Sequence, residues 1–244
     1  MSDENWGTFV REEDDAPIFV FADLGLMDAA PVTAAPVCTR VELDLPQTAE
    51  GELDWETAEA IDDSLESVPA VRAGRTTRDG VRVEYFYSDD GGAAEAAVAA
   101  AMAGVPQVRW SASSDDDAEW SLYEKHLRPT LAEWAWMQDQ KVLHALRNDG
   151  DDGTAARPVT HWAYFPDAAA ASRYAEQAEP LGFTAPLNGP AGDSPEDGWP
   201  VRLEKTQPLA DGQITESTLR LRVLAERCGG DYDGWETEFV PSGG

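Results

Sequence analysis

The sequence predicts an α+β protein with two ferredoxin-like domains, each a βαββαβ unit with an antiparallel sheet, joined by a helix. Two patterns support this prediction. Both halves of the chain show strand and helix signals in the same order, and a segment rich in Gly, Asp and Pro separates them. The 244 residues, 42% of them hydrophobic and nine of them Trp, supply enough apolar material for two cores. We therefore expect a four-stranded sheet in each half, with both helices on one face.

The C-terminal half shows the clearer order of elements. The aromatic and β-branched segment PVTHWAYF, residues 158–165, is typical of a strand. A helix is expected between Pro166 and Gly182, because Pro favours the first turn of a helix and Gly the position after its end. The short strand FTAPL, the strand WPVRLEKTQ, a second helix that ends at Gly229–Gly230 and a final strand complete the unit.

The N-terminal half repeats this order after an irregular start. The segment PVCTRVELDL, residues 36–45, predicts a strand, and Asp54 is the expected cap of the helix that follows. The strands VRAGRTT and VRVEYFYS flank Asp79–Gly80, a strong hairpin signal. The Ala-rich residues 93–104 are expected to form the second helix, and PQVRWSA, residues 106–112, the last strand.

The segment NDGDDGTAARP, residues 148–158, is predicted to be a linker or an exposed loop. Before it, apolar residues recur at three- and four-residue spacing over residues 121–147, which predicts an amphipathic helix that begins or kinks at Pro129. The predicted domains are therefore residues 1–149, which include this connecting helix, and residues 157–244.

The charge of the chain restricts its partners. There are 47 Asp and Glu residues against 18 Lys and Arg residues, a formal net charge of -29, and the isoelectric point is near 4.1. Such a charge repels phosphate backbones and anionic lipid surfaces and attracts a basic protein surface. An adaptation for solubility would explain the same charge without any partner. We predict a basic protein partner, no direct binding of nucleic acid and no membrane.

The cysteines and the N-terminus indicate the compartment. Cys38 and Cys228 lie far apart and outside any CxxC or Cys/His cluster, so they are predicted to be free thiols in a reducing environment. The start MSDENWGTFVREED has neither the basic residues nor the apolar stretch of a signal peptide. No run approaches the roughly 18 apolar residues that span a bilayer. We therefore expect a cytoplasmic protein.

No catalytic, cofactor or metal site is predicted. The three histidines, His126, His144 and His161, lie in no HExxH, CxxC, GxSxG or phosphate-loop pattern. The first two are expected on one helix about 27 Å apart, too far to share a metal. His161, in a strand, is expected to be packed or exposed at the rim of the sheet, and not to be a ligand. The acidic segments at residues 113–120 and 196–200 could supply oxygen ligands to a hard cation. For the first of them, a solvated loop that caps the next helix is the preferred interpretation.

The segment GGDYDGWETEF, residues 229–239, mixes aromatic residues with carboxylates and leaves two interpretations open. In both, Asp233–Gly234 is expected to form a turn or a bulge. In the structural interpretation, Trp235 and Phe239 pack into the helix layer and the glutamates face water. In the functional interpretation, this corner contacts a partner, since Tyr and Trp favour interfaces. The candidate partner-binding residues are Tyr232, Asp233, Trp235 and Glu236.

Three pieces of the C-terminal half carry a family resemblance: THWAYF, the Gly-Phe of LGFTAPL and, above all, GGDYDGWETEFV. Through them, the segment from about Arg157 to Val240 resembles the ribonuclease E regulator B (RraB) family. The resemblance implies a ferredoxin-like domain in an acidic protein that binds an endoribonuclease and lowers its activity on RNA, without catalysis of its own.

The N-terminal half carries a second resemblance, in TTRDGVRVEYFYSDD, DDDAEWSLYEKHLRP and EWAWMQDQKVLHAL. Through these pieces, the segment from about Trp6 to Asp149 resembles the DUF695 family. This resemblance implies no activity and supplies no catalytic residues.

Two classes of function remain open. The first is an acidic, non-catalytic regulatory or interaction protein that binds and inhibits an RNA-degrading enzyme of the ribonuclease E type. The second is an enzyme, dependent on a small molecule or a metal, of unknown reaction. The absence of nucleophile, metal and phosphate-binding motifs from the sequence favours the first class.

Overall fold

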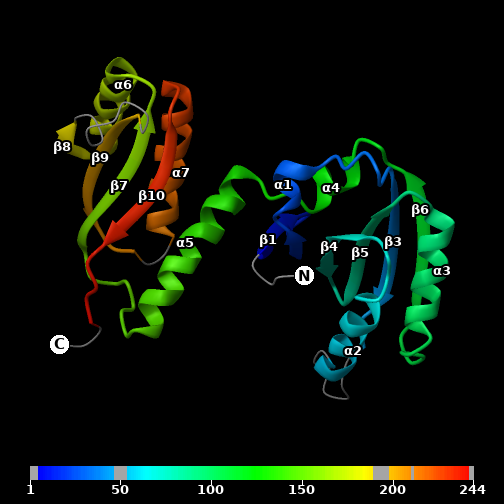
Figure 1. Ribbon diagram of the computed structural model, residues 1–244. Coiled ribbons are helices and arrows are strands. Elements are labelled where there is room, and N and C mark those ends of the chain that lie inside the picture. The colour runs from blue at the N-terminus through cyan, green and yellow to red at the C-terminus, as the bar shows by residue number, and fades with distance from the viewer. Residues whose placement is uncertain (1–4, 47–53, 189–197, 210–211, 242–244) are drawn as a thin grey trace. The chain divides into compact units, whose positions relative to one another are not determined.

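The computed structural model describes residues 5–46, 54–188, 198–209 and 212–241 (Figure 1). The chain divides into two compact units, Met1–Glu133 and Trp134–Gly244. Helix α5, Leu131–Asn148, begins at the end of the first unit and continues into the second. The helix expected over residues 121–147 is divided at Pro129 into α4, Ser121–His126, and α5, and the boundary between the units lies near the start of α5.

The first unit contains a six-stranded antiparallel sheet with the strand order β1-β2-β4-β5-β3-β6. Its strands are β1 (Trp6–Glu13), β2 (Ala16–Asp23), β3 (Val37–Asp44), β4 (Val71–Arg78), β5 (Val81–Ser88) and β6 (Trp110–Asp116). Its helices are α1 (Leu26–Ala29), α2 (Trp55–Leu65), α3 (Gly91–Met102) and α4 (Ser121–His126).

The expectation of a four-stranded sheet is wrong for this unit, because the irregular start forms the hairpin β1–β2. Asp14 and Asp15 turn the chain with φ of 53° and 59°, the left-handed pair that a two-residue hairpin turn requires. Opposite each other in the hairpin lie Phe9 and Val20, each 1% exposed. Asp-Asp is a weaker turn signal than Asp-Gly, and β1 is rich in polar residues, so the pattern did not predict a strand pair.

The rest of the first unit follows the expected order. The Asp54 side chain accepts a hydrogen bond from the Thr57 backbone N–H at 3.2 Å and caps α2, and Asp79–Gly80 forms the β4–β5 turn. Helices α2 and α3 pack on one face of the sheet, in a core that includes Ile61 and Phe86. The opposite face is also covered, because the neighbouring Tyr87 stacks on the fully buried Trp120, with ring centroids 3.8 Å apart.

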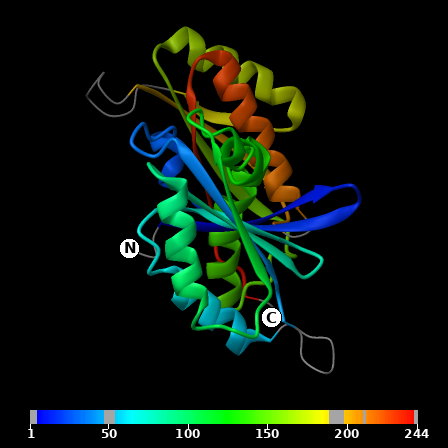
Figure 2. The ribbon, with the colours of Figure 1, turned by 90° about the vertical axis from the view of Figure 1, so that its right-hand side faces the viewer.

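The second unit has the expected four-stranded antiparallel sheet, with the strand order β10-β7-β9-β8. Its strands are β7 (Arg157–Phe165), β8 (Thr184–Asn188), β9 (Trp199–Gln207) and β10 (Asp231–Thr237). Its helices, besides α5, are α6 (Ala168–Ala178), the short 3-10 helix η2 (Glu179–Leu181) and α7 (Gln213–Cys228). Helices α6 and α7 lie side by side and share one core on one face of the sheet (Figure 2).

The segment predicted as a linker, residues 148–158, is not exposed throughout. Asp151 is 1% exposed and Arg157 is 3% exposed, and the two side chains form a buried ion pair. The expectation of a solvated connection is therefore wrong at these two positions, because the pair fixes this segment to the second unit.

Two further expectations concern thiols and membrane spans. Cys38 and Cys228 are free thiols, as predicted, and both are buried. Within the described ranges, no helix combines the length and the apolar character that crossing a bilayer requires.

Candidate interaction site

A β-bulge in β10 decides where the predicted corner points. The register between β10 and β7 shifts after Tyr232, so that Asp233 is the extra residue, and the predicted bulge is confirmed. Tyr232 then lies opposite Ala163, and Trp235 lies opposite His161. Residues that lie opposite each other in an antiparallel pair point to the same face. Both aromatic side chains therefore face the helix-covered side, although three positions separate them in a strand of period two.

Tyr232 belongs to the core of the second unit. It is 6% exposed, and its hydroxyl lies 2.9 Å from Nδ1 of His161, which is 1% exposed. Burial lowers the pKa of His161 to about 3, so the imidazole is neutral at physiological pH and shares one hydrogen bond with the Tyr232 hydroxyl. Of the two positions expected for this strand histidine, packed or at the rim, the structure shows the packed one. Tyr232 holds β10 against β7, and its burial leaves little of it for a partner to contact.

Trp235 is half-buried and packs with a small apolar cluster that includes Val159 and Ile214. Its Nε1 donates to Oδ1 of Asp139 at 2.8 Å, and the Thr218 hydroxyl donates to Oδ2 of the same carboxylate at 2.8 Å. Asp139 lies on α5 and is 3% exposed. One buried carboxylate therefore joins α5, α7 and β10.

We expect Asp139→Asn to leave the second unit at least as stable as the wild type at pH 7. Burial raises the pKa of Asp139, against the hydrogen bonds from Thr218 and Trp235, so the ionised carboxylate costs stability that a neutral amide does not. The pKa of Asp139 is higher in the folded state than in the unfolded state. Its carboxyl group therefore contributes fully to stability below the unfolded-state pKa, and this contribution is lost as the pH rises through the folded-state pKa. Any advantage of the variant should shrink as the pH falls towards about 4.

Hydrogen exchange of the β7 and β10 amides measures the difference in stability between variant and wild type. The two proteins are compared at pH 7 and again at about pH 4. Asp139→Ala is the control. It leaves Trp235 Nε1 without its acceptor, while the Thr218 hydroxyl keeps only the Thr215 carbonyl at 3.1 Å. This variant should cost about 1–3 kcal/mol both at pH 7 and at about pH 4. A loss for Asp139→Asn at pH 7 as large as that for Asp139→Ala would contradict the assignment.

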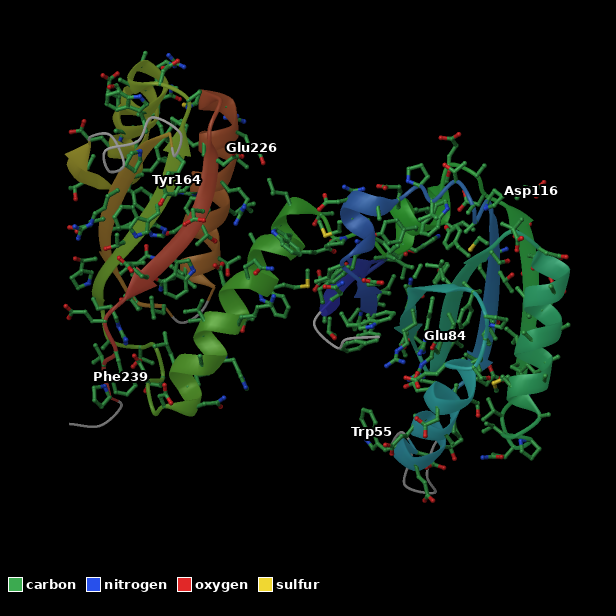
Figure 3. All side chains as sticks on the ribbon, viewed as in Figure 1. Trp55, Glu84, Asp116, Tyr164, Glu226 and Phe239 are labelled. Carbon is green, nitrogen blue, oxygen red and sulfur yellow. The ribbon has the colours of Figure 1, made fainter. Side chains whose placement is uncertain are left out.

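The face of the second sheet opposite α6 and α7, called the open face here, carries aromatic and charged side chains. Trp162 and Tyr164 are half-buried on β7, and Tyr164 is labelled in Figure 3. The Arg202 guanidinium lies 6.0 Å from the centroid of the Trp162 ring and pairs with Glu204. Trp162 Nε1 donates to Glu236 Oε1 at 3.2 Å. The open face consists of Thr160, Trp162, Tyr164, Pro200, Arg202, Glu204, Asp231 and Glu236.

The four predicted partner-binding residues therefore separate. Tyr232 and Trp235 point to the core side, Glu236 belongs to the open face, and Asp233 is exposed in the bulge. The structural interpretation is right in placing Trp235 against the helix layer and wrong for Phe239, which lies beyond the end of β10 and is 47% exposed.

Trp162 and Tyr164 are not among the residues predicted for a partner-binding site, although the sequence carries a signal for them. They alternate with the buried residues of HWAYF, so they must lie on the sheet face away from the helices once both helices pack on one side.

The acidic segments form no metal site in the described part of the chain. No group of three or more His, Cys, Asp or Glu side chains could hold a metal ion among the described residues. In the segment 113–120, the Asp117 carboxylate accepts from the backbone N–H groups of Ser121 and Leu122, at 2.7 and 3.0 Å, at the start of α4. The expected capping of α4 is thus confirmed at Asp117. The expected solvated loop is wrong, because residues 113–116 continue strand β6 and Asp117 itself is 8% exposed. In the segment 196–200, Glu196 and Asp197 lie outside the described residues.

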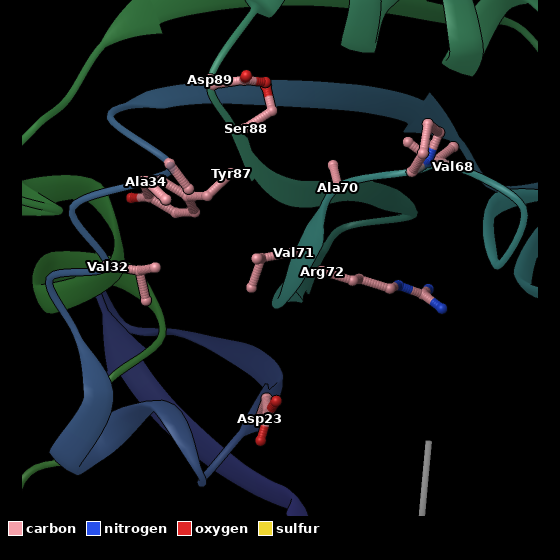
Figure 4. A pocket seen from close by; sticks show the side chains of 12 residues that line it. Asp23, Val32, Ala34, Val68, Ala70, Val71, Arg72, Tyr87, Ser88 and Asp89 are labelled. Atoms are coloured by element: carbon pink, nitrogen blue, oxygen red, sulfur yellow. The ribbon is translucent and has the colours of Figure 1, made fainter.

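The first unit contains cavities of its own. One of them has a volume of about 570 Å³, and Figure 4 shows Val32, Val71 and Tyr87 around it. Arg72 reaches this cavity, but its guanidinium is bound to Asp62 and Glu84. Another cavity, of about 410 Å³, is lined by aromatic residues and arginines.

Comparison with known families covers both units. The model of the family of unknown function DUF695 matches residues 4–128, and the model of regulator of ribonuclease activity B (RraB) matches residues 136–237. No curated protein matches the chain. A crystal structure of an unknown protein from Galdieria sulphuraria is similar at 11% identity, over 84% of this chain and 99% of that one, with a TM-score of 0.23.

Proposed function

Since the chain belongs to the DUF695 family and its residues 136–237 match RraB, a family of regulators of ribonuclease activity, we propose that it is an acidic, non-catalytic regulator. It binds an RNA-degrading enzyme of the ribonuclease E type and inhibits it. The match of the second unit to RraB is the single observation that carries this proposal. The protein acts in the cytoplasm, through a basic protein partner, without contacting nucleic acid or membrane.

Both units are proposed to be ferredoxin-like, and the strand orders support this. In the second unit, the βαββαβ elements give the order fourth, first, third and second strand across the sheet. The strands β3 to β6 of the first unit have the same order, and β1 and β2 extend the sheet beyond β4.

The proposed contact surface is the open face together with the exposed Asp233. The open face presents three carboxylates against one guanidinium, beside two aromatic rings. Aromatic residues supply contact area, and the surplus of carboxylates suits a basic partner. Single-stranded nucleic acid would instead need a positive groove beside the rings. Here Trp162 donates to the carboxylate of Glu236, which would repel a phosphate.

We expect Asp233→Asn combined with Glu236→Gln to slow association with a purified ribonuclease E-type enzyme about tenfold or more at low salt. Removing two charges that face the partner reduces electrostatic steering, and the difference should shrink as salt shortens the Debye length to about 8 Å at 0.15 M. Surface plasmon resonance measures the association rate. Cleavage of a model RNA by the enzyme, with and without this protein, measures inhibition.

The control is Glu59→Gln with Asp63→Asn, which removes the same number of charges from exposed positions of α2 in the first unit. Equal slowing by both pairs would show that only net charge matters, and would overturn the assigned surface. In a gel shift, saturable binding of single-stranded RNA to the isolated protein at micromolar concentration would overturn the proposal that it avoids nucleic acid.

A further inference from the structure

The hairpin β1–β2 extends the first sheet beyond the helices that cover it (Figure 2). Thr8, Phe21, Arg75 and Glu84 lie opposite one another in a row across β1, β2, β4 and β5, and Glu84 lies opposite Val41 of β3. Val41 packs in the core under α2 and α3, so the whole row belongs to the helix-covered face. The strands β1, β2, β4 and β5 thus form, together with the start of α2, a surface that we call the shelf. It consists of Thr8, Phe19, Phe21, Trp55, Arg75 and Arg82.

The shelf leaves large aromatic side chains in solvent. Trp55, the first residue of α2, is 75% exposed, and Phe19 is 53% exposed. Phe21 stacks on Trp6 with ring centroids 4.7 Å apart and an interplanar angle of 8°. The rings of Phe19, Phe21 and Trp55 border the cavity of about 410 Å³, a volume within the usual range for small-molecule sites. Clustered exposed aromatics are typical of a binding surface.

The charge of the shelf is opposite to that of the chain. Among the described residues that line the cavity, two are arginines, Arg75 and Arg82, and none is a carboxylate. Together with Arg72, these two arginines share the two carboxylates of Asp62 and Glu84, so three guanidiniums face two carboxylates. This group therefore carries one positive charge more than its described partners neutralise.

Arg82 is the least satisfied of the three arginines. It is 5% exposed, its Nη1 lies 3.4 Å from Asp62 and 3.8 Å from Glu84, and its Nε has no hydrogen-bond partner among the described residues. Burial and the neighbouring charge of Arg75 lower the pKa of Arg82. An anion at the shelf would supply the missing negative charge.

We propose that the shelf binds a small aromatic anion, with its ring against Phe19 and Trp55 and its anionic group at Arg75 and Arg82. The arginine fork recognises a carboxylate or a phosphate in the same way, so both kinds of anion fit the site. This site lies in the first unit and does not depend on the regulatory role proposed for the second.

Isothermal titration calorimetry of the full chain with naphthoate and with adenosine monophosphate tests the proposal. We expect saturable binding by at least one of these anions with a Kd below about 1 mM. Tighter binding of naphthoate would indicate a carboxylate ligand, and tighter binding of adenosine monophosphate a phosphate ligand. Naphthalene methanol, which has the ring without the charge, and inorganic phosphate, which has the charge without a ring, should each bind at least about tenfold more weakly.

Two variants remove one half of the site each. Trp55→Ala changes a largely exposed residue, and Arg75→Gln removes a guanidinium, and each should weaken binding about tenfold or more. The matched controls are Trp136→Ala and Arg109→Gln, at a residue 40% exposed and a side chain 90% exposed, which should leave the Kd unchanged. The proposal is overturned if neither anion binds saturably, if Trp55→Ala binds like the wild type, or if the uncharged ring binds as tightly as the anions.

Discussion

Replacing Asp151 with alanine is expected to destabilise the second unit by roughly 3–5 kcal/mol, because it leaves a buried guanidinium without its counter-charge. Arg157 is 3% exposed, and both of its terminal nitrogens donate to the Asp151 carboxylate. The same carboxylate accepts from the backbone N–H groups of Gly153 and Val240, each at 2.9 Å. One side chain thus ties the segment before β7 to the segment after β10.

The pH dependence of this pair follows from its geometry. The hydrogen bond from Arg157 holds the pKa of Asp151 well below its ordinary value, although burial opposes this. The contribution of Asp151 is therefore present above the unfolded pKa and is lost only as the pH falls through the lower folded pKa. At about pH 3, where many free aspartates take up a proton, the wild type should still keep most of its advantage over the variant.

Hydrogen exchange of the β7 and β10 amides, resolved by mass spectrometry, reports the loss for the second unit alone. Asp149→Ala, at an exposed position two residues earlier, should change the free energy of unfolding by less than about 0.5 kcal/mol. Adding Arg157→Met to Asp151→Ala should recover part of the loss, since the unpaired charge is then gone. An Asp151→Ala protein that exchanges like the wild type would contradict the buried pair.

The second large effect is expected in the first unit, where Glu84→Ala should cost roughly 3–5 kcal/mol. Glu84, labelled in Figure 3, is fully buried on β5. Its Oε2 accepts from Nε and Nη2 of Arg72 at 3.0 and 2.9 Å. Its Oε1 lies 3.8 Å from both Arg75 and Arg82. Without it, Asp62 alone faces three guanidiniums that repel one another.

Exchange of the β4 and β5 amides measures this loss. Glu84→Gln keeps an acceptor for Arg72 without the charge and should fall between the wild type and Glu84→Ala. Glu42→Ala, at an exposed position of the neighbouring strand β3, is the matched control and should have little effect. A cost for Glu84→Ala below about 1 kcal/mol would mean that the arginines find other acceptors or reach water.

Local signals in the sequence predicted most of the architecture. Asp54 as a cap, Asp79–Gly80 as a hairpin turn and Gly229 as a helix end all depend on neighbouring residues, and the structure confirms each of them. The hairpin β1–β2 and the pair Asp151–Arg157 could not be found in this way. The hairpin has a weak turn signal, and the partner that buries Asp151 becomes visible only in three dimensions.

The candidate site was predicted less completely. The bulge at Asp233 was expected, but its consequence was not, because only the register with β7 shows that Tyr232 and Trp235 turn to the same side. Trp235 finds its polar partner 96 residues away, on α5. A contact of this kind depends on tertiary packing, which no periodicity along the chain encodes.

The two buried cysteines allow the unfolding of each unit to be followed by alkylation of its thiol. Cys38 lies on β3 in the first unit, and Cys228 is the last residue of α7 in the second. Burial raises the pKa of Cys38 to about 12 and also raises that of Cys228, so neither thiol presents the reactive thiolate in the folded chain. Alkylation of either thiol must therefore wait until its unit opens. The order in which the two thiols are modified as urea increases gives the order in which the two units lose their structure.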